Sequence, residues 1–484
     1  MAESLKDKSI KGISWSFVEQ ILTRGVNFVI GIILARLLSP TDYGLVGMIA
    51  VFIAISQIFI DGGLSNALIR QKNSSEEDFS TVFIINFVLS LFFYFILFFA
   101  AGPIADFYEQ PVLKSFLRVI ALTLIISSFG SIHNTLLTIR IDFRTKSIIS
   151  IVSAIASGVI GIYFAYQGYG AWALAAQSLS ATIVCTLMLV LMVRWFPTKG
   201  FSRDSFKRLF AYSSKLLSSN LIRVIYDNAY PIVIGKKFSA AALGQYSRAG
   251  QFPNVANATV TSALNRVAFP LLSQMQDDDE QLIRVYEKYI QLTCFVMFPI
   301  LLWLCGCARP LVLFLLTDKW LECVPLMQIL CFSLLTNGMT NINMNLLYVK
   351  GRSDLALRLE IIKKTIAFVI LIVSMFFGLT AMCLGQVLYS FIDFGLNTYY
   401  TKQILDYGFW PQVKAVAPYF LCALAVLAEG LLFSHVIGTL WLSLLASAIV
   451  CPLTYLLLCK MTNLYAYQEM KEMVSQKILK RNVE

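Results

Sequence analysis

The stretch TVFIINFVLSLFFYFILFFAA, from Thr81 to Ala101, decides the fold class of this chain. It runs for 21 residues without a charged side chain, and about 20 such residues form a helix that crosses a hydrocarbon core of roughly 30 Å. Comparable runs recur along all 484 residues, of which 58% are hydrophobic and 14% charged. A soluble domain carries charge on about a quarter of its residues. The composition therefore excludes a water-soluble protein and predicts an all-α polytopic membrane protein.

Fourteen apolar runs have the length and hydropathy of transmembrane helices. They lie near Trp15–Leu38, Tyr43–Asp61, Thr81–Ala101, Phe116–Ile139, Ser147–Tyr166, Ala171–Val193, Ala211–Gly235, Gly244–Leu271, Tyr289–Ala308, Glu322–Tyr348, Ile361–Gly378, Thr380–Thr401, Val413–Ser434 and Gly438–Cys459. Between the sixth and seventh runs, WFPTKGFSRDSFKR combines Pro, Gly and charge and predicts a boundary between two halves. We expect an N-lobe of six helices over residues 1–205, a C-lobe of six over 206–405, and two further helices with a basic tail over 406–484.

Lys and Arg alternate between the two sides of these spans. One side, which includes both termini, holds 27 of the 39 Lys and Arg residues, and the other side holds 6. Because cytoplasmic loops are rich in Lys and Arg, both termini are predicted to be cytoplasmic, in agreement with an even number of spans. The net charge of +11 is then mostly loop charge that sets orientation, and it does not indicate a nucleic-acid partner.

Six cations remain inside the predicted spans: Arg24, Arg36, Lys215, Arg223, Arg248 and Arg266. Each costs about 2.5–3.5 kcal/mol at the bilayer centre even on the lenient insertion scale. Arg36 and Arg266 lie near helix ends, where snorkelling explains them equally well. Arg24 and Arg223 lie nearer the middle of their spans, so they are predicted to face a partner or a watery cavity.

Polar residues recur at helical spacing around these cations. Gln20, Arg24 and Asn27 belong to one stripe on the first span, and Lys215, Arg223 and Tyr230 belong to another on the seventh. Further stripes occur on the fourth span, Ser127, Ser131, Asn134 and Thr138, and on the tenth, Asn337, Asn341, Asn345 and Tyr348. Helix packing through Ser, Thr and Asn explains the fourth and tenth stripes well, but it leaves the cations unexplained.

Three acids inside the spans, Asp61, Asp227 and Asp393, are candidates for ion coupling and equally for counter-ions of a nearby Arg. Asp227 lies one turn from Arg223 and is a candidate partner for it.

The sequence offers no basis for cofactor or metal chemistry. It lacks GxxxxGK[ST] and CxxC, and its two histidines, His133 and His435, are far apart. Cys305, Cys307 and Cys323 are candidates for pairing in an oxidising compartment, although packing explains them better. No external loop is long enough for a catalytic domain, so we predict a protein that is not an enzyme and has no catalytic or metal-binding residues and no cofactor.

A faint repeat links the halves at an offset of 200 residues. Arg36-Leu-Leu-Ser39 and Gly44 recur as Lys236-Lys-Phe-Ser239 and Gly244. Each segment joins the first and second spans of its half, and two duplicated halves favour a substrate site at their interface.

Several stretches resemble a known family. LARLLSPTDYGLVGMIAVFIAISQIFIDGGLSNALIRQK (Leu34–Lys72) is similar to the opening of Wzx-type polysaccharide flippases of the multidrug/oligosaccharidyl-lipid/polysaccharide (MOP) exporter superfamily. RVAFPLLSQMQDDDEQL (Arg266–Leu282) and TDKWLECVPLMQILC (Thr317–Cys331) resemble the colanic acid exporter branch. QPVLKSFLRVIALTLIISSFG (Gln110–Gly130) and RIDFRTKSIIS (Arg140–Ser150) extend the match through the first half.

The resemblance implies two six-helix lobes plus two helices, alternating access, and export of an undecaprenyl-diphosphate-linked oligosaccharide across the bacterial inner membrane. In that family the export serves capsule, exopolysaccharide, lipopolysaccharide or O-antigen biosynthesis. We expect this chain to act as a monomer in membrane lipid. In related flippases the last two helices form a hydrophobic groove. Arg24, Arg223 and Arg248 occupy places comparable to the family's cavity arginines, while Lys215 and Arg266 have no assigned equivalents.

Three alternatives stay open on sequence grounds. A drug/cation antiporter of the same superfamily would need an acidic cavity, and an integral membrane glycosyltransferase or polymerase would need a long external loop with catalytic acids. A scaffold would use the basic loops and tail to contact other polysaccharide-assembly proteins or anionic lipid, although topology alone explains those loops better.

Overall fold

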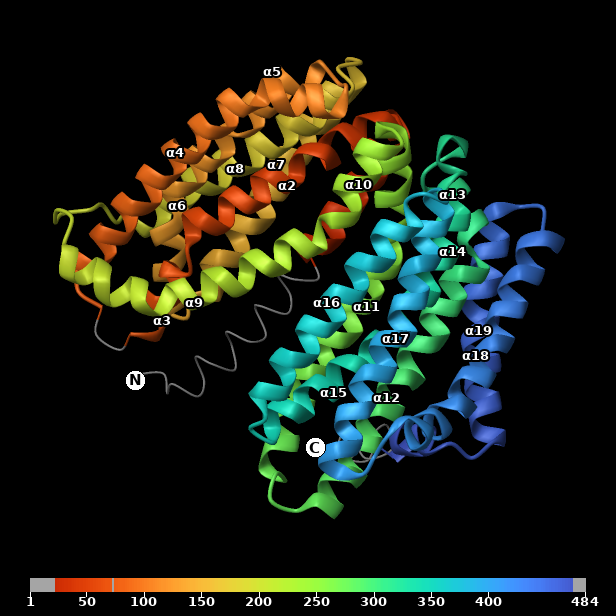
Figure 1. The fold of residues 1–484 in the computed structure, drawn as a ribbon. Coiled ribbons are helices and arrows are strands. Elements are labelled where there is room, and N and C mark those ends of the chain that lie inside the picture. Colours follow the sequence, from red (N-terminus) through yellow and green to blue (C-terminus); the bar gives the residue numbers. More distant parts are fainter. Residues whose placement is uncertain (1–21, 72–73, 473–484) are drawn as a thin grey trace, which may run out of the picture. The chain divides into compact units, whose positions relative to one another are not determined.

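The structure, a computed structural model, describes residues 22–71 and 74–472, and within them it is built of helices without a strand (Figure 1). Residues 22–37 form the first described helix and residues 465–472 the last. The others are α2 (Pro40–Asp61), α3 (Leu64–Arg70), α4 (Glu76–Tyr108), α5 (Val112–Ile120), α6 (Leu122–Ile139), α7 (Phe143–Tyr166), α8 (Ala171–Val193), α9 (Arg203–Asp227), α10 (Ala229–Lys237), α11 (Ala240–Gln274), α12 (Asp279–Gly306), α13 (Ala308–Leu315), the short 3₁₀ helix η1 (Asp318–Trp320), α14 (Cys323–Ser333), α15 (Asn337–Val349), α16 (Ser353–Ser374), α17 (Leu379–Leu405), α18 (Phe409–Val436) and α19 (Leu440–Met461).

Ten of the described helices or helix pairs are long and apolar enough to cross a membrane. The predicted all-α multi-pass fold is therefore confirmed, and the number fourteen stays a prediction. The predicted spans that fall outside these ten correspond to residues 22–37, α9 with α10, α11 and α16. Residues 22–37 are too short a described segment to span a membrane by themselves, whereas α9, α11 and α16 carry charged side chains that lower the hydropathy of their helices.

The chain folds into two compact units that meet between Gly244 and Gln245. In the first unit, α4, α6, α7 and α8 pack side by side, with α2 against α4 and α9 (Figure 1). In the second, α12 packs against α18, and α17 packs against α14 and α16. Helices α9 and α10, which the sequence assigns to the second lobe, pack against α2 within the first unit. The predicted lobe boundaries at residues 205 and 405 stay a prediction.

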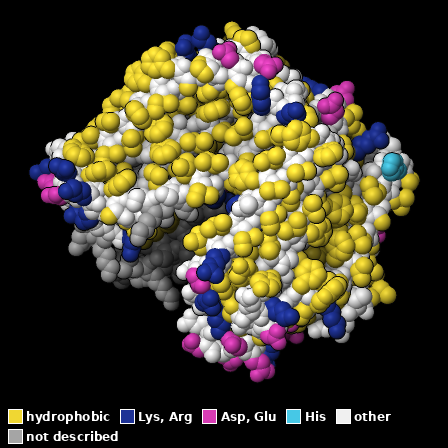
Figure 2. Space-filling view, in the orientation of Figure 1, with side chains coloured by type: hydrophobic (Ala, Val, Ile, Leu, Met, Phe, Trp, Pro, Cys, Tyr) yellow, Lys and Arg dark blue, Asp and Glu magenta, His cyan; other side chains and the backbone are white. Residues whose placement is uncertain are grey.

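Apolar side chains cover much of the surface, and Lys, Arg, Asp and Glu gather toward helix ends on the face shown in Figure 2. On α4, Val88, Phe92, Phe95 and Phe99 are all exposed. A continuous exposed apolar face on a helix is unstable in water and is expected where lipid surrounds the protein.

Local sequence explains how α2 begins and ends. Ser39 accepts a hydrogen bond from the Asp42 backbone, and the Asp42 side chain accepts one from the Ser39 backbone, which forms a capping box beside Pro40. Gly62 and Gly63 have φ of 49° and 73°, a conformation that glycine adopts without steric cost. The helix therefore ends at Asp61, and α3 begins at Leu64.

The predicted repeat appears in the first unit as a reciprocal contact between two helix N-termini. Ser39 and Ser239 occupy matching capping positions, where Ser239 Oγ accepts from the Ala242 backbone at 3.0 Å. A Cβ atom on Gly44 would lie 1.7 Å from the Ala240 carbonyl oxygen, and one on Gly244 would lie 1.9 Å from that of Pro40. Glycine at both positions is what allows α2 and the start of α11 to approach so closely.

Beside this contact, the Lys236 ammonium donates a hydrogen bond to Glu109 Oε1 at 2.9 Å. This hydrogen bond lowers the pKa of the exposed Glu109 carboxyl, which follows the last residue of α4.

Candidate functional site

A polar hollow of about 590 Å³ lies among the helices of the first unit. Its polar lining residues come from five helices and are Thr23, Asn27, Gln57, Asp61, Ser127, Ser131, Asn134, Lys146, Ser150, Ser153, Ser157, Thr182 and Thr186. An apolar span has no structural need for so many hydroxyl and amide groups at one place, so the hollow is a candidate binding site.

A second hollow of about 510 Å³ adjoins the first and shares Asp61, Ser131, Asn134 and Lys146 with it. Its other polar lining residues come from α3, α6 and α9 and are Ser65, Asn66, Thr135, Thr138, Asn220 and Arg223. We refer to the two hollows together as the N-unit cavity.

Three side chains carry charge among the described residues that line the N-unit cavity: Asp61, Lys146 and Arg223. Lys146 Nζ donates to Thr138 Oγ1 at 3.4 Å, and Arg223 Nη2 donates to Asn220 Oδ1 at 3.4 Å. The cavity therefore has one more positive than negative charge and is suited to an anionic ligand.

Each charged residue reaches the cavity for a local reason. The Gly62-Gly63 turn ends α2 at Asp61, whose side chain is hydrogen-bonded by Gln57 one turn earlier. Lys146 lies in the first turn of α7, and Ser150, Ser153 and Ser157 follow it at spacings of four, three and four residues. This spacing places all of them along one face of α7, facing the cavity that they line.

Some residues of the predicted polar stripes line this cavity, and others do not. Asn27 and Thr23 of the first stripe line it, whereas Arg24 has an exposed side chain and is absent from the lining. Arg223 lines it, and so does the whole fourth-span stripe, for which helix packing is therefore not the full explanation. Gln20, and the side chains of Lys215 and Arg266, lie outside the described part of the chain.

Arg248 is held inside the second unit. Its side chain is buried, its guanidinium lies 5.4 Å from the ring centroid of Trp320, and Nη1 donates to Gln251 Oε1. The Gln245 side-chain amide also donates to the Lys319 carbonyl at 2.9 Å. This hydrogen bond holds the first turns of α11 against η1. These contacts are those of a residue that packs α11 against η1, and a role for Arg248 in substrate binding stays a prediction.

The remaining predicted site residues are not among those that line the N-unit cavity. In the second unit Asn341 Nδ2 donates to Asn337 Oδ1 at 2.6 Å, and Asp393 is paired with Lys363 at 2.7 Å. Asp227 is the last residue of α9 and is exposed. Ion coupling at Asp61, Asp227 or Asp393 stays a prediction.

The sequence analysis assigns Lys146 and Lys363 to cytoplasmic loops and does not identify either as a candidate functional residue. In the structure both lie within helices. The signal that could have found Lys146 is the run of serines that continues its helical stripe. Lys363 gave a weaker signal, because its partner Asp393 lies on another helix and 30 residues away in the sequence.

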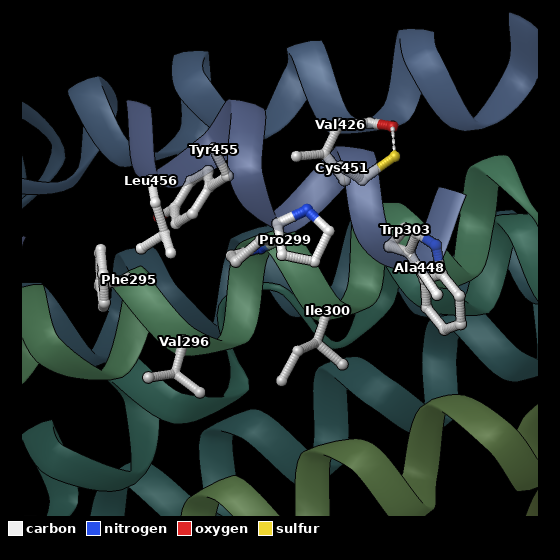
Figure 3. A pocket seen from close by; sticks show the side chains of 11 residues that line it. Phe295, Val296, Pro299, Ile300, Trp303, Val426, Ala448, Cys451, Tyr455 and Leu456 are labelled. Carbon is white, nitrogen blue, oxygen red and sulfur yellow. Dashed lines mark hydrogen bonds between the residues drawn. The ribbon is translucent and has the colours of Figure 1, made fainter. Parts of the chain in front are cut away.

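An apolar groove of about 370 Å³ lies on the second unit (Figure 3). It is lined by α12, α18 and α19 through Phe295, Val296, Pro299, Ile300, Trp303, Val426, Ala448, Cys451, Pro452, Tyr455 and Leu456. Pro299 and Pro452 interrupt their helices' hydrogen-bond ladders here, and the Cys451 thiol donates to the Val426 carbonyl at 3.8 Å. The groove has the lining of a site for a hydrocarbon chain.

All ten cysteines lie in the described residues and none forms a disulfide. Nine are buried and Cys185 is half-buried. The proposed pairing among Cys305, Cys307 and Cys323 is thus absent in this structure, and these residues pack as small apolar groups.

Comparison with known proteins places the chain in a family. A family model described as polysaccharide biosynthesis protein matches residues 33–325, more than half of the chain. The chain belongs to this family. Its apolar helices make it a multi-pass membrane protein. The succinoglycan biosynthesis transport protein ExoT of Rhizobium meliloti (strain 1021) is 28% identical over 334 residues, 69% of this chain and 68% of the relative. The lipopolysaccharide biosynthesis protein WzxC of Escherichia coli (strain K12) is 25% identical over 402 residues, 81% of this chain and 80% of the relative.

Solved structures of low sequence identity share the fold. The lipid II flippase MurJ in an inward closed conformation gives a TM-score of 0.74 at 13% identity and covers 94% of this chain and 99% of its own. An inward-facing multidrug resistance MATE family transporter of the MOP superfamily gives 0.59 at 14% identity and covers 80% and 95%. The family match and the relatives confirm the predicted Wzx-type resemblance, and the solved structures confirm the predicted fold.

Proposed function

We propose that this protein is a flippase that moves an undecaprenyl-diphosphate-linked oligosaccharide across the bacterial inner membrane by alternating access. The observation that carries the proposal is the N-unit cavity, in which Lys146 and Arg223 line a hollow otherwise rich in hydroxyl and amide groups. The transport proteins and flippase to which the chain is similar support the same class of activity.

Lys146 and Arg223 reduce the free-energy cost of moving the charged diphosphate across the membrane. A diphosphate is costly to move through hydrocarbon because its charge loses its hydration. Lys146 supplies a compact positive charge, and the planar Arg223 guanidinium binds two phosphate oxygens at once. Asp61 lines the same hollow and offsets one of the two positive charges.

The neutral lining suits sugar hydroxyls. Ser127, Ser131 and Thr138 each donate their own hydroxyl proton to a carbonyl of the same helix, at 3.1, 2.9 and 2.9 Å. Ser131 Oγ already accepts from Asn86 Nδ2 at 3.2 Å and Thr138 Oγ1 from Lys146 Nζ at 3.4 Å, so each of these two keeps one lone pair for a sugar hydroxyl group. Asn134 offers both a donor and an acceptor. Such a lining tolerates different sugars, because it depends on hydroxyl groups rather than on one ring.

The lipid tail needs an apolar path, and the groove on α12, α18 and α19 supports this part of the proposal. A polyprenyl chain that lies in such a groove or in lipid never enters the polar cavity, so only the headgroup has to be desolvated. In this arrangement both termini are cytoplasmic, the chain works as a monomer in membrane lipid without a cofactor, and no catalytic step is required.

The alternatives fit the described residues less well. An antiporter of organic cations would be disfavoured by a cavity with Lys146 and Arg223 against one acid. A glycosyltransferase or polymerase would need a pair of catalytic carboxylates, and Asp61 is the single carboxylate among the described lining residues of the cavity.

The test uses a deletion strain complemented with variants expressed at equal level. We expect the strain to accumulate a lipid-linked oligosaccharide, detected by mass spectrometry, and the wild-type chain to remove it. Lys146→Ala or Arg223→Ala should each reduce export about 10- to 100-fold, because a hydrogen bond to a charged group contributes roughly 1.5–3 kcal/mol. The double variant should fail to complement, and Arg24→Ala in parallel tests the arginine nominated from sequence.

Arg140→Ala is the matched control, because Arg140 is an exposed cation that follows α6 and is absent from the cavity lining. It should complement fully. Full export by the Lys146/Arg223 double variant would rule out the cationic cavity, and a deletion strain without lipid-linked sugar would rule out the flippase.

A further inference from the structure

Asp61 is the single carboxylate among the described lining residues of the N-unit cavity, and the proposed diphosphate site does not use it as a ligand. Its side chain is exposed toward the cavity and is hydrogen-bonded by Gln57. The ion pairs found within residues 22–71 and 74–472 are made by other acids. Lys146, which lines the same two hollows, donates to Thr138. The Asp61 carboxylate can therefore accept hydrogen bonds from a ligand in the cavity.

The cavity has a cationic end and a hydroxyl-rich end, and Asp61 lies where the two meet. Arg223 lines the second hollow only, whereas Ser150 and Thr182 line the first hollow only. Asp61 and Lys146 line both hollows. A diphosphate held by Lys146 and Arg223 therefore has Asp61 beside it, at the entrance to the hydroxyl-rich hollow.

The first hollow extends away from the cationic end along α7. Lys146, Ser150, Ser153 and Ser157 line it in that order, and eleven residues separate the first from the last. At 1.5 Å per residue this distance is about 16 Å. In a lipid-linked oligosaccharide the first sugar is bonded directly to the diphosphate, and the other sugars follow it. The first sugar therefore meets Asp61, and the others have room along the serine face of α7.

Several hydroxyl groups of the first hollow can only accept hydrogen bonds from a ligand. Ser127, Ser157 and Thr182 donate their own protons to carbonyls of their helices at 3.1, 3.1 and 2.9 Å. A ligand beside them gains most when it carries hydrogen-bond donors, as sugar hydroxyl groups do. A carboxylate accepts such bonds roughly twice as strongly as a neutral oxygen, so Asp61 is the strongest acceptor in this lining.

The charges of the cavity also select the kind of sugar. A diphosphate diester carries two negative charges, which Lys146 and Arg223 balance. The carboxylate of Asp61 is then left without a counter-charge among the described lining residues. A carboxylate on the first sugar would be repelled by Asp61 at short range, whereas neutral hydroxyl groups form charge-assisted hydrogen bonds with it.

We propose that Asp61 is a specificity-determining residue that binds hydroxyl groups of the sugar attached directly to the diphosphate. The substrate class is then a lipid-linked oligosaccharide whose first sugar is neutral and has unmodified hydroxyl groups. This inference rests on the proposed flippase function, because it requires the lipid diphosphate to bind at Lys146 and Arg223.

The test measures the binding of three ligands to the detergent-solubilised full chain by native mass spectrometry. The ligands are undecaprenyl diphosphate, undecaprenyl diphosphate glucose and undecaprenyl diphosphate glucuronic acid. For the wild-type chain we expect glucose to lower the Kd about tenfold relative to undecaprenyl diphosphate, and glucuronic acid to raise it about tenfold relative to glucose. Asp61→Asn should reduce both factors to about two, because the amide keeps the shape of the side chain and loses its charge.

Undecaprenyl diphosphate without a sugar shows whether the variant is folded. Removal of a negative charge should leave its Kd unchanged or lower it, whereas an unfolded variant would lose all three ligands. Asp354→Asn is the matched control, because Asp354 is an exposed acid of the second unit that pairs with Arg352 at 3.0 Å. It should give the wild-type factors for both sugars.

Two results would overturn the role of Asp61 and leave the flippase function intact. One is a wild-type glucose factor in an Asp61→Asn chain that still binds undecaprenyl diphosphate. The other is equal binding of the glucose and glucuronic acid ligands by the wild-type chain. Failure of the wild-type chain to bind undecaprenyl diphosphate at all would instead overturn the proposed function, and this inference with it.

Discussion

At the scale of single residues, the partners of a charge decide its role. Lys146 and Lys363 look alike in the sequence, since both lie near the cytoplasmic ends of predicted spans. In the structure Lys146 lines a polar cavity, whereas Lys363 is enclosed by Glu360 and Asp393. The first is available to an incoming anion and the second is neutralised by its own chain.

Asp78 is a residue whose charge serves structure. It is fully buried at the start of α4, accepts from the Ser75 backbone at 3.0 Å, and pairs with Arg208 Nη2 at 2.5 Å. Arg208 belongs to α9, so this pair fastens α9 to α4 within the first unit.

We expect Asp78→Ala to lower the free energy of unfolding by about 1–3 kcal/mol, because the Ser75 N–H and Arg208 lose their acceptor. Thermal unfolding of the purified protein in detergent measures this change as a lower Tm. The exposed pair at Asp354 offers a comparison, since Asp354→Ala should change stability by less than about 0.5 kcal/mol. Equal Tm values for the two variants would contradict the anchoring role.

At the scale of helices, the reciprocal contact of Gly44 and Gly244 explains the 200-residue repeat seen in the sequence. The two glycines face the carbonyl oxygens of Ala240 and Pro40, which themselves differ by 200 positions. The close approach depends on backbone atoms, so a flexible side chain cannot move aside to admit a methyl group.

Gly44→Ala and Gly244→Ala should therefore destabilise the protein by similar amounts, about 1–3 kcal/mol each, as overpacking typically does. Gly102 on α4 is the control, because a Cβ atom there would meet nothing within 4 Å. Gly102→Ala should leave Tm unchanged or raise it, since alanine favours a helix. A neutral effect of Gly44→Ala would show that the helix ends tolerate separation.

At the scale of the whole molecule, orientation in the membrane follows from the loop charges. The exposed Gln167 lies between α7 and α8 on the predicted external side, and the exposed Gly200 lies between α8 and α9 on the cytoplasmic side. Because nine native cysteines are buried and one is half-buried, background labelling should be low.

A membrane-impermeant maleimide should label Gln167→Cys in intact spheroplasts and label Gly200→Cys only after the membrane is opened. Labelling of a wild-type sample sets the background from Cys185. The reverse pattern would place both termini outside the cytoplasm and would contradict the predicted topology.

The sequence by itself determined the helical membrane fold and the resemblance to the family, and the orientation that follows from loop charge stays a prediction. The physical reason is that lipid offers no hydrogen bonds, so each span must satisfy its own backbone and its apolar length is visible locally. Tertiary structure alone decided which polar groups meet: it joined Asp61, Lys146 and Arg223 in one cavity, left Arg24 outside its lining, and paired Lys363 with Asp393. Those contacts depend on helix rotation and packing between residues far apart in the chain, and helical spacing within one span does not encode them.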